Sequence, residues 1–236
     1  MNIRTKKSFL NLLKQRVGYR LYTEPHIVRW IETRFHKLFY GTGVPGGWKS
    51  LYWLGIKTQK NPFDLWIYQE ILSEQRPDVI VECGTYRGGS ALFLAGVCDL
   101  LGTGQVITID TEQPEGLPRH HRIEYLHGSS TSLIILETLK NMIREGSEVM
   151  VILDSDHHKD HVVKELELYS QMVTKGQYLI VEDTNINGHP IYADFGPGPM
   201  EAIKEFLKTD PGFVVDKRRE KLHLTFNPGG YLRKIK

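Results

Sequence analysis

The sequence has few cysteines, no long apolar run and no apolar core of a signal peptide, and each of these features would indicate a class of protein. It has two cysteines, Cys83 and Cys98, and both fall in apolar segments. We therefore expect buried free thiols in a reducing compartment, the cytoplasm, rather than a disulfide framework. No run of eighteen apolar residues occurs, so no membrane-spanning helix is expected. The N-terminus lacks the apolar core of a signal peptide.

A large excess of either charge is absent as well. Lys and Arg number 30 and Asp and Glu 28, a net charge of +2, so nothing calls for nucleic acid as a partner. Basic residues near the N-terminus, such as Lys6, Lys7 and Lys14, are interpreted as a solvated helix face. There is no internal repeat. The 236 residues suffice for one domain with a substantial core.

Short apolar strands alternate with helical segments along most of the chain. Strands are predicted over Asp78–Cys83, Gln105–Asp110, Arg122–His127, Glu148–Asp154, Gln177–Asp183, Phe213–Asp216 and Lys221–Phe226. Helices are predicted over Phe63–Glu74, Gly89–Leu101, Thr131–Arg144, Lys159–Val173 and Met200–Lys208. This alternation predicts a doubly wound, mostly parallel α/β sheet covered on both faces. The last two strands flank the charged turn Lys217–Glu220 and predict an antiparallel hairpin at the sheet edge.

The segment before this pattern is different. Residues 1–40 have apolar positions at helical spacing, whereas Gly41–Pro62 is rich in Gly, Pro and Trp and is predicted to be a long loop. We therefore divide the chain into an N-terminal helical extension and loop, 1–60, and a domain, 61–236. The loop aromatics Trp48, Tyr52 and Trp53 either form an apolar wall over a site, as His189–Pro199 could, or pack as ordinary core.

A glycine-rich turn follows the first strand of the domain. Gly84 allows a tight turn, and Gly88 and Gly89 are expected to let the backbone approach a ligand. Ser90 can cap the following helix, where a carboxylate or phosphate is favoured. The spacing is not the GxGxxG of dinucleotide sites, which disfavours a nicotinamide enzyme.

Two further segments have positions suited to a nucleoside. Asp110 ends the next strand, about twenty residues after the glycines, where an acid binds ribose hydroxyls. The small polar turn His127–Ser130 follows the third strand and could lie along the edge of an adenine ring.

Carboxylates follow the fourth and fifth strands. Asp154 follows one, and Glu182 and Asp183 follow the other. Because ligands bind outside the carboxyl ends of such strands, and neighbouring strands lie about 5 Å apart, these acids should converge beside the glycine turn. Their mutual repulsion calls for a cation, and hard oxygen ligands favour magnesium, with another divalent ion as an alternative. The competing interpretation is an exposed acidic loop with helix caps.

His157 lies at the same rim, three residues after Asp154. Histidines titrate near neutral pH, so this side chain is a candidate base for a substrate hydroxyl.

The sequence resembles the cephalosporin hydroxylase and rhamnosyl O-methyltransferase family, a branch of the class I S-adenosylmethionine-dependent methyltransferases. The matching stretches are NPFDLWIYQE, VECGTYRGGSALFLA, LDSDHHKDHV, YLIVEDTNINGHP, FGPGP and TFNPGGYL, within residues 60–231. No facial His-His-carboxylate iron site is evident. The resemblance implies a Rossmann-like, seven-stranded sheet with its last strand antiparallel.

The same resemblance implies roles for individual residues. It implies S-adenosylmethionine contacts from the Glu82–Ser90 turn, with Ser90 near the methionine carboxylate, Asp110 on the ribose and Gly128–Ser130 near adenine. The cofactor contacts implied are Glu82, Gly84, Tyr86, Gly88, Ser90, Asp110, Ser129, Ser130 and Asp154. The metal ligands implied are Asp154, Glu182 and Asp183, with Asp156 as an alternative. His157 falls where such enzymes place a base, although catechol enzymes use lysine there, and this leaves the base assignment open.

These inferences predict a metal-dependent O-methyltransferase that acts on a hydroxyl of a sugar, glycoside or small natural product. The metal would lower the acceptor's pKa, and His157, with Asp154, would complete the catalytic centre. The apolar positions of residues 1–40 predict a homo-oligomer, unless they pack on the chain's own domain. An NAD-dependent oxidoreductase and a non-catalytic S-adenosylmethionine-binding protein are the alternatives.

Overall fold

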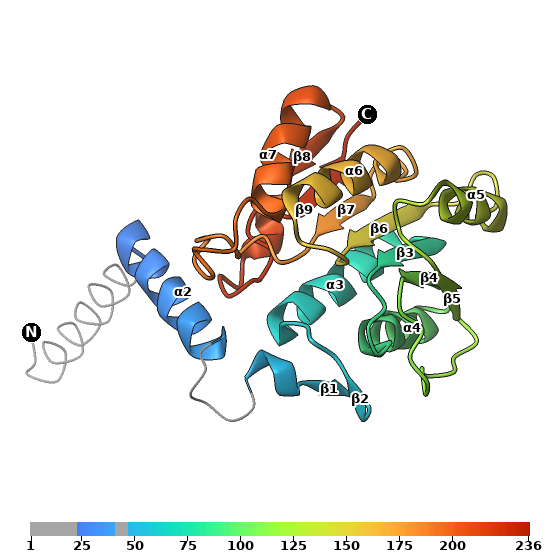
Figure 1. Cartoon of the computed structure of the whole chain (residues 1–236), viewed down its shortest axis with the longest axis horizontal. Helices are drawn as coiled ribbons and strands as arrows, with labels where there is room; N and C mark the ends of the chain where they lie inside the picture. The colour runs from blue at the N-terminus through green and yellow to red at the C-terminus, as the bar shows by residue number, and fades with distance from the viewer. Residues whose placement is uncertain (1–22, 41–46) are drawn as a thin grey trace, which may run out of the picture.

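The computed structural model describes residues 23–40 and 47–236. Figure 1 shows one twisted sheet between two layers of helices. The strands are β3 (Val79–Cys83), β4 (Gln105–Asp110), β5 (Ile123–His127), β6 (Val149–Leu153), β7 (Tyr178–Val181), β8 (Phe213–Val215) and β9 (Tyr231–Lys234). Their order is β5-β4-β3-β6-β7-β9-β8. The doubly wound, mostly parallel seven-stranded sheet predicted from the sequence is confirmed.

Strand order reverses between β3 and β6. Strands β5, β4, β3, β6 and β7 are parallel, and β9 runs antiparallel to both β7 and β8. The connections from β3 lead away in one direction and those from β6 in the other. In open α/β sheets this reversal leaves a crevice at the carboxyl ends of the strands, where ligands bind.

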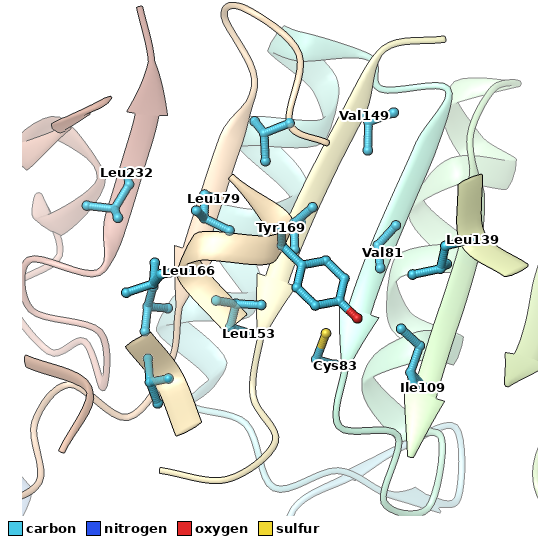
Figure 2. Close-up of a cluster of buried hydrophobic side chains, with 14 of the residues drawn as sticks. Val81, Cys83, Ile109, Leu139, Val149, Leu153, Leu166, Tyr169, Leu179 and Leu232 are labelled. Atoms are coloured by element: carbon cyan, nitrogen blue, oxygen red, sulfur yellow. The ribbon is translucent and has the colours of Figure 1, made fainter. Parts of the chain in front are cut away.

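Helices cover both faces of the sheet. They are α3 (Pro62–Gln75), α4 (Gly89–Leu101), α5 (Leu133–Met142), α6 (Lys159–Tyr169) and α7 (Pro199–Thr209). Side chains alternate along each strand, so odd-numbered residues of β3 join α5, α6 and α7 while Ile80 joins α3 and α4. Figure 2 shows the first of these clusters, with Tyr169 of α6 lying over the strands near Cys83. Cys83 and Cys98 are both buried and free, as expected.

Helix α2 (Pro25–Tyr40) lies outside the two helical layers (Figure 1). The part of the predicted helical region that the structure describes is this helix, and residues 1–22 lie outside the described residues. Its aromatic side chains pack on the domain: the rings of Phe39 and Tyr40 lie 5.6 and 4.7 Å from that of Phe226. No helix among the described residues is long and apolar enough to cross a membrane.

Residues 47–62, the described part of the predicted loop 41–62, have more regular structure than the composition of the loop indicated. This part contains a 3-10 turn, η1 (Trp48–Ser50), and a small hairpin of β1 (Tyr52–Trp53) and β2 (Ile56–Lys57). Trp53 packs edge-on against Phe93 of α4, with ring centroids 4.9 Å apart. One loop tryptophan therefore belongs to the core, in agreement with one of the two interpretations.

The prediction of a strand over 221–226 was wrong. Residues Lys217–Glu220 form the 3-10 helix η2, and the strand that pairs with β8 is β9, which begins at Tyr231. The alternation in 221–226 reflects other contacts. Phe226 donates its backbone N–H to the buried carboxylate of Asp64, 2.8 Å away, and accepts from the backbone N–H of Asn185. The antiparallel pair exists, but its connection is long.

Candidate active site

A cavity of about 850 Å³ lies at the carboxyl ends of β3, β4, β6 and β7. Its volume is within the range of small-molecule sites. Its walls include Tyr40, Trp48, Thr58, Lys60, Gly84, Thr85, Tyr86, Gly89, Ser90, Asp110, Ser129, Ser130, Asp154, Asp156, His157, Asp183, Tyr192 and Phe195. Residues of the N-terminal extension thus share one cavity with the strand ends.

The glycines of the β3–α4 turn are needed for close packing within the protein. Gly84 has a φ of 104°, and a Cβ there would lie 2.0 Å from the backbone oxygen of Asp154. A Cβ on Gly89 would lie 1.9 Å from Oγ1 of Thr58. Gly88, with a φ of 75°, packs against Pro118. Packing against Thr58 and Pro118 is thus a reason for Gly89 and Gly88 that the sequence did not indicate, and Gly84 and Gly89 also line the cavity.

Asp110 holds the glycine turn in place. Its Oδ2 accepts hydrogen bonds from the backbone N–H groups of Thr85 and Tyr86, at 2.9 and 2.8 Å. Its Oδ1 accepts from the backbone N–H of Glu112 at 3.0 Å. Oδ2 thus uses both of its lone pairs on the glycine turn, whereas Oδ1 keeps one. A ribose hydroxyl bound to Asp110 would therefore use Oδ1, while Oδ2 holds the glycine turn.

Glu82 lies beneath this turn and is fully buried. Its Oε2 accepts a hydrogen bond from the hydroxyl of Thr108 at 2.7 Å, while its Oε1 has no partner among the described residues. Burial raises the pKa of this carboxyl, and Lys60 and Ser90 oppose the rise. Glu82 is therefore an acid one layer behind the cavity wall.

The turn after β5 forms the far end of the same wall. Ser129 and Ser130 both line the cavity. The backbone oxygen of Ser130 accepts a hydrogen bond from the hydroxyl of Tyr169 at 2.8 Å, and its Oγ lies 3.3 Å from Nε2 of His161. The turn is thus fixed from the α6 side.

Three carboxylates reach one face of the sheet because side chains alternate along a strand. Glu82, Asp154 and Glu182 each lie at or just beyond a strand end, two residues after an isoleucine that packs on α3 and α4. Those isoleucines are Ile80, Ile152 and Ile180. The register places Asp154 beside Glu182, just beyond the pair Leu153 and Val181, whereas Glu82 is level with Ile152 and lies deeper on the same face.

Lys60 is the cation that meets them. Its ammonium group forms ion pairs with Oδ2 of Asp154 and Oε1 of Glu182, and only 4% of its side chain is exposed. Glu182 also accepts a hydrogen bond from the hydroxyl of Tyr68 at 2.7 Å. Burial lowers the pKa of Lys60, but the charges of Asp154, Glu182 and Glu82 outweigh it and raise the pKa well above its usual value. Lys60 therefore stays charged.

Asp183 faces a different direction from Glu182. Its φ of 52° places the backbone in the left-handed region, which Asp tolerates, and ends the strand alternation. Its Oδ2 lies 3.2 Å from Nε2 of His157, and its Oδ1 accepts a hydrogen bond from the hydroxyl of Tyr40 at 3.2 Å. Asp154, His157 and Asp183 each offer a ligand atom within 4.8 Å of the others.

Asp156, the alternative ligand, is engaged elsewhere at the rim. Its Oδ1 accepts a hydrogen bond from the backbone N–H of His158 at 2.8 Å and lies 2.6 Å from that residue's Nδ1. The expected convergence of Asp154, Glu182 and Asp183 is present only in part. Asp154, His157 and Asp183 offer ligand atoms close together, whereas Glu182 faces inward to Lys60 and Tyr68 and does not belong to this group.

Sequence reasoning missed Lys60, Tyr40 and Tyr68. One signal for Lys60 was available: it directly precedes Asn61-Pro62, a helix-start pair, and a cluster of buried acids requires a nearby cation. Tyr40 and Tyr68 had no such signal, because each is one aromatic residue among several at helical spacing.

The sequence and the fold both match known proteins. A family model described as Rhamnosyl O-methyltransferase/CmcI matches residues 46–235. A rhamnosyl O-methyltransferase of Mycobacterium tuberculosis is 38% identical over 209 residues, which cover 86% of this chain and 84% of that protein.

Two solved structures of CmcI agree in fold. The apo-structure aligns with a TM-score of 0.63 and 22% identity, covering 85% of this chain and 84% of that chain. A structure described as containing Mg and SAM aligns with a TM-score of 0.59 and 23% identity, covering 80% and 78%. The family match spans most of the residues that build the sheet and the cavity, and the chain belongs to the Rhamnosyl O-methyltransferase/CmcI family.

Proposed function

We propose that this protein transfers the methyl group of S-adenosylmethionine to a hydroxyl of a sugar, glycoside or small natural product, with the help of a divalent metal ion, magnesium in the first place. Membership of the matched family makes the chain an S-adenosylmethionine-dependent O-methyltransferase. The observation that carries the proposal is the cluster of Asp154, His157 and Asp183 in the same cavity as the glycine turn.

The cofactor half of the cavity suits a nucleoside with a charged amino-acid tail. Asp110 supplies a carboxylate for ribose hydroxyls, and Ser129 and Ser130 supply hydroxyls at the adenine end. Ser90, in the first turn of α4, supplies a hydroxyl near the helix N-terminus, where a carboxylate is favoured. Tyr86 lines the same wall. These contacts support the assignments made from the sequence.

The other half suits a hard cation. Asp154, Glu182 and Asp183 would hold the ion, because magnesium prefers oxygen ligands, whereas Asp156 is bonded to His158. CmcI, a member of the same family, has a structure described as containing Mg and SAM. When bound, the ion would supply Lewis acidity that lowers the pKa of the acceptor hydroxyl and orients it.

The chain's own groups would handle the proton. Bound S-adenosylmethionine would supply the methyl group to the acceptor oxygen, with cleavage of its carbon–sulfur bond and S-adenosylhomocysteine as the second product. Nε2 of His157 lies 3.2 Å from Oδ2 of Asp183, and with the ring proton on Nε2 the second ring nitrogen would accept the hydroxyl proton. Asp183 would thus orient the base. Asp154 contributes charge beside the reacting oxygen.

An aromatic wall supports a ring-shaped acceptor. Tyr40 lies against Trp48 and Tyr192, with ring centroids 5.2 and 5.6 Å apart, and all three line the cavity. Aromatic faces with a few polar groups are typical of sites for amphipathic small molecules, to which glycosides belong.

A transfer assay with labelled methyl donor tests the proposal. Purified protein is incubated with a panel of glycosides and simple phenols, first with EDTA and then with added magnesium. We expect transfer to a glycoside hydroxyl, loss of transfer in EDTA and recovery with magnesium. Full activity in metal-free protein would reject the metal, and binding without transfer to any acceptor would favour a non-catalytic role.

We further propose that the extension 1–60 works as part of the domain 61–236, and that the protein is a homo-oligomer. Tyr40 and Lys60 line the cavity. On α2, Trp30 and Leu38 are 58% and 63% exposed, with the guanidinium of Arg34 over the Trp30 ring, and a second copy would cover these two apolar side chains. Light scattering at micromolar concentration, repeated with Trp30→Glu, tests this; a wild-type monomer contradicts it.

A further inference from the structure

Lys60 stands at a fixed position in the chain. It directly precedes α3, whose N-cap Asn61 accepts a hydrogen bond from the backbone N–H of Phe63 at 3.1 Å. The side-chain amide of Asn61 donates to the backbone oxygen of Leu224. Two elements far apart in sequence therefore fix the backbone next to Lys60, and the ammonium group is directed at the strand ends by this framework.

The surroundings of Lys60 are ionic and closed. Its ammonium contacts carboxylate oxygens of Asp154 and Glu182, and Glu82 lies on the same face. Glu182 is 4% exposed and Glu82 is fully buried, so water does not screen these charges well. Without a cation, three carboxylates would face one another in a region of low dielectric constant.

Two of those carboxylates are also the ones that the proposed function assigns to a metal. If a divalent ion bound to Asp154 and Glu182 while Lys60 stayed paired with them, the two cations would lie side by side. Their mutual repulsion would oppose the attraction of each cation for the carboxylates.

We propose that Lys60 is a resident cation that takes the place of the metal ion in the metal-free protein, pairing with Asp154 and Glu182 so that the site stays folded and weakening divalent binding until the ion competes with it. This rests on the proposed function, which supplies the metal. Lys60 is a positioning residue: it keeps the carboxylates at the strand ends and restrains their affinity for cations.

The experiment compares Lys60→Met with the wild type in two measurements that need no turnover. Met keeps the length of the side chain and removes its charge. In metal-free buffer, the thermal midpoint of Lys60→Met should fall by roughly 10 °C, since one partner of a buried pair has gone. In calorimetry with magnesium chloride, the same variant should bind at least tenfold more tightly. Magnesium should therefore restore most of the lost midpoint.

Lys159→Met is the matched control. Lys159 also pairs with a carboxylate, that of Glu205, but at the surface of α6. Its thermal midpoint and magnesium affinity should stay close to those of the wild type. Unchanged or weaker magnesium binding by Lys60→Met, with the control unaffected, overturns the inference.

Two arms keep the test decisive if Lys60→Met does not fold in metal-free buffer. The variant is then prepared in magnesium, and Lys60→Met is combined with Glu182→Gln, which removes both charges of the pair. Folding recovered by either arm supports a charge role. Failure of both assigns Lys60 to packing alone and overturns the inference. If the wild type binds no magnesium, the metal part of the proposed function fails instead, and that result is visible before any variant is made.

Discussion

The two halves of the cavity are built differently. In the cofactor half, Asp110 is bonded to backbone N–H groups of the neighbouring glycine turn, within three consecutive βα units. In the metal half, Asp154 and Glu182 meet Lys60 across 94 and 122 positions of sequence, and Asp183 meets Tyr40 across 143. The first half is assembled by local backbone geometry, and the second by segments that tertiary packing brings together.

The same contrast appears in how charge is balanced. Backbone dipoles satisfy Asp110, whereas the acids of the metal half depend on Lys60 and on hydroxyl and imidazole groups. Burial raises the pKa of Asp154 and of Glu182, and Lys60 opposes this. Perturbed acids of this kind mark functional sites. Because different groups hold the two halves in place, we expect a substitution in one half to leave ligand binding in the other half unchanged.

The largest effect should come from Asp183→Ala. This change removes a proposed metal ligand and the orienting partner of His157, and loss of several kcal/mol of metal assistance corresponds to roughly a 10⁴-fold lower turnover. Single-turnover assays measure it. S-adenosylmethionine affinity, from calorimetry, should stay within about twofold of wild type. A large drop in cofactor affinity would break the separation of the two halves.

His157→Ala should lower turnover by roughly 10²–10⁴-fold, the contribution of a positioned base. The metal requirement should remain, because the carboxylates are intact. His158→Ala is the neighbouring control: its side chain is exposed and bonded to Asp156. Near-normal turnover by His157→Ala would move the base to another group, and His158 and Asp156 would be the first to examine.

Asp110→Ala should weaken S-adenosylmethionine binding by about 1–3 kcal/mol, the scale of hydrogen bonds to charged groups. The effect should be the same with and without magnesium, since the cofactor half does not use the metal. Equilibrium binding at both conditions measures it, with the exposed Glu115→Ala as control. Unchanged affinity would remove Asp110 from the cofactor site.

The smallest effect should be a pH dependence of stability from His36. Burial lowers the pKa of this histidine to about 4, and its Nδ1 accepts a hydrogen bond from Asn185. The unfolded chain binds the proton near pH 6.5, so stability is fully present above that pH and is lost as the pH falls toward 4. Between pH 7.5 and 5 the loss should be about 2 kcal/mol.

Urea unfolding of wild type and His36→Phe at both pH values isolates this contribution, with His26→Gln, an exposed position on the same helix, as control. Because α2 also carries Tyr40, acid should disturb the metal half before the cofactor half. Identical pH dependence in wild type and His36→Phe would show that α2 is not held in this way.

Regular elements were predictable because their signals are local. The strand Gln105–Asp110 and the helix Gly89–Leu101 have the bounds expected from apolar runs and glycine boundaries. The prediction of a strand over 221–226 was wrong because the backbone of Phe226 bonds to Asp64 and Asn185 instead of to a neighbouring strand. The hairpin of β1 and β2 was missed because two-residue strands have too short a pattern to read.

By itself, the sequence determined the parallel sheet, the switch point and the strand ends at which Asp110, Asp154 and Glu182 stand, because alternation and chain order are properties of the backbone. Only the tertiary structure decided what each acid meets. Lys60 and Tyr40 precede the first strand of the sheet, and a contact across such a separation depends on packing of whole elements. The left-handed backbone at Asp183 likewise turns its carboxylate from Lys60 toward His157, a direction set by the loop after β7.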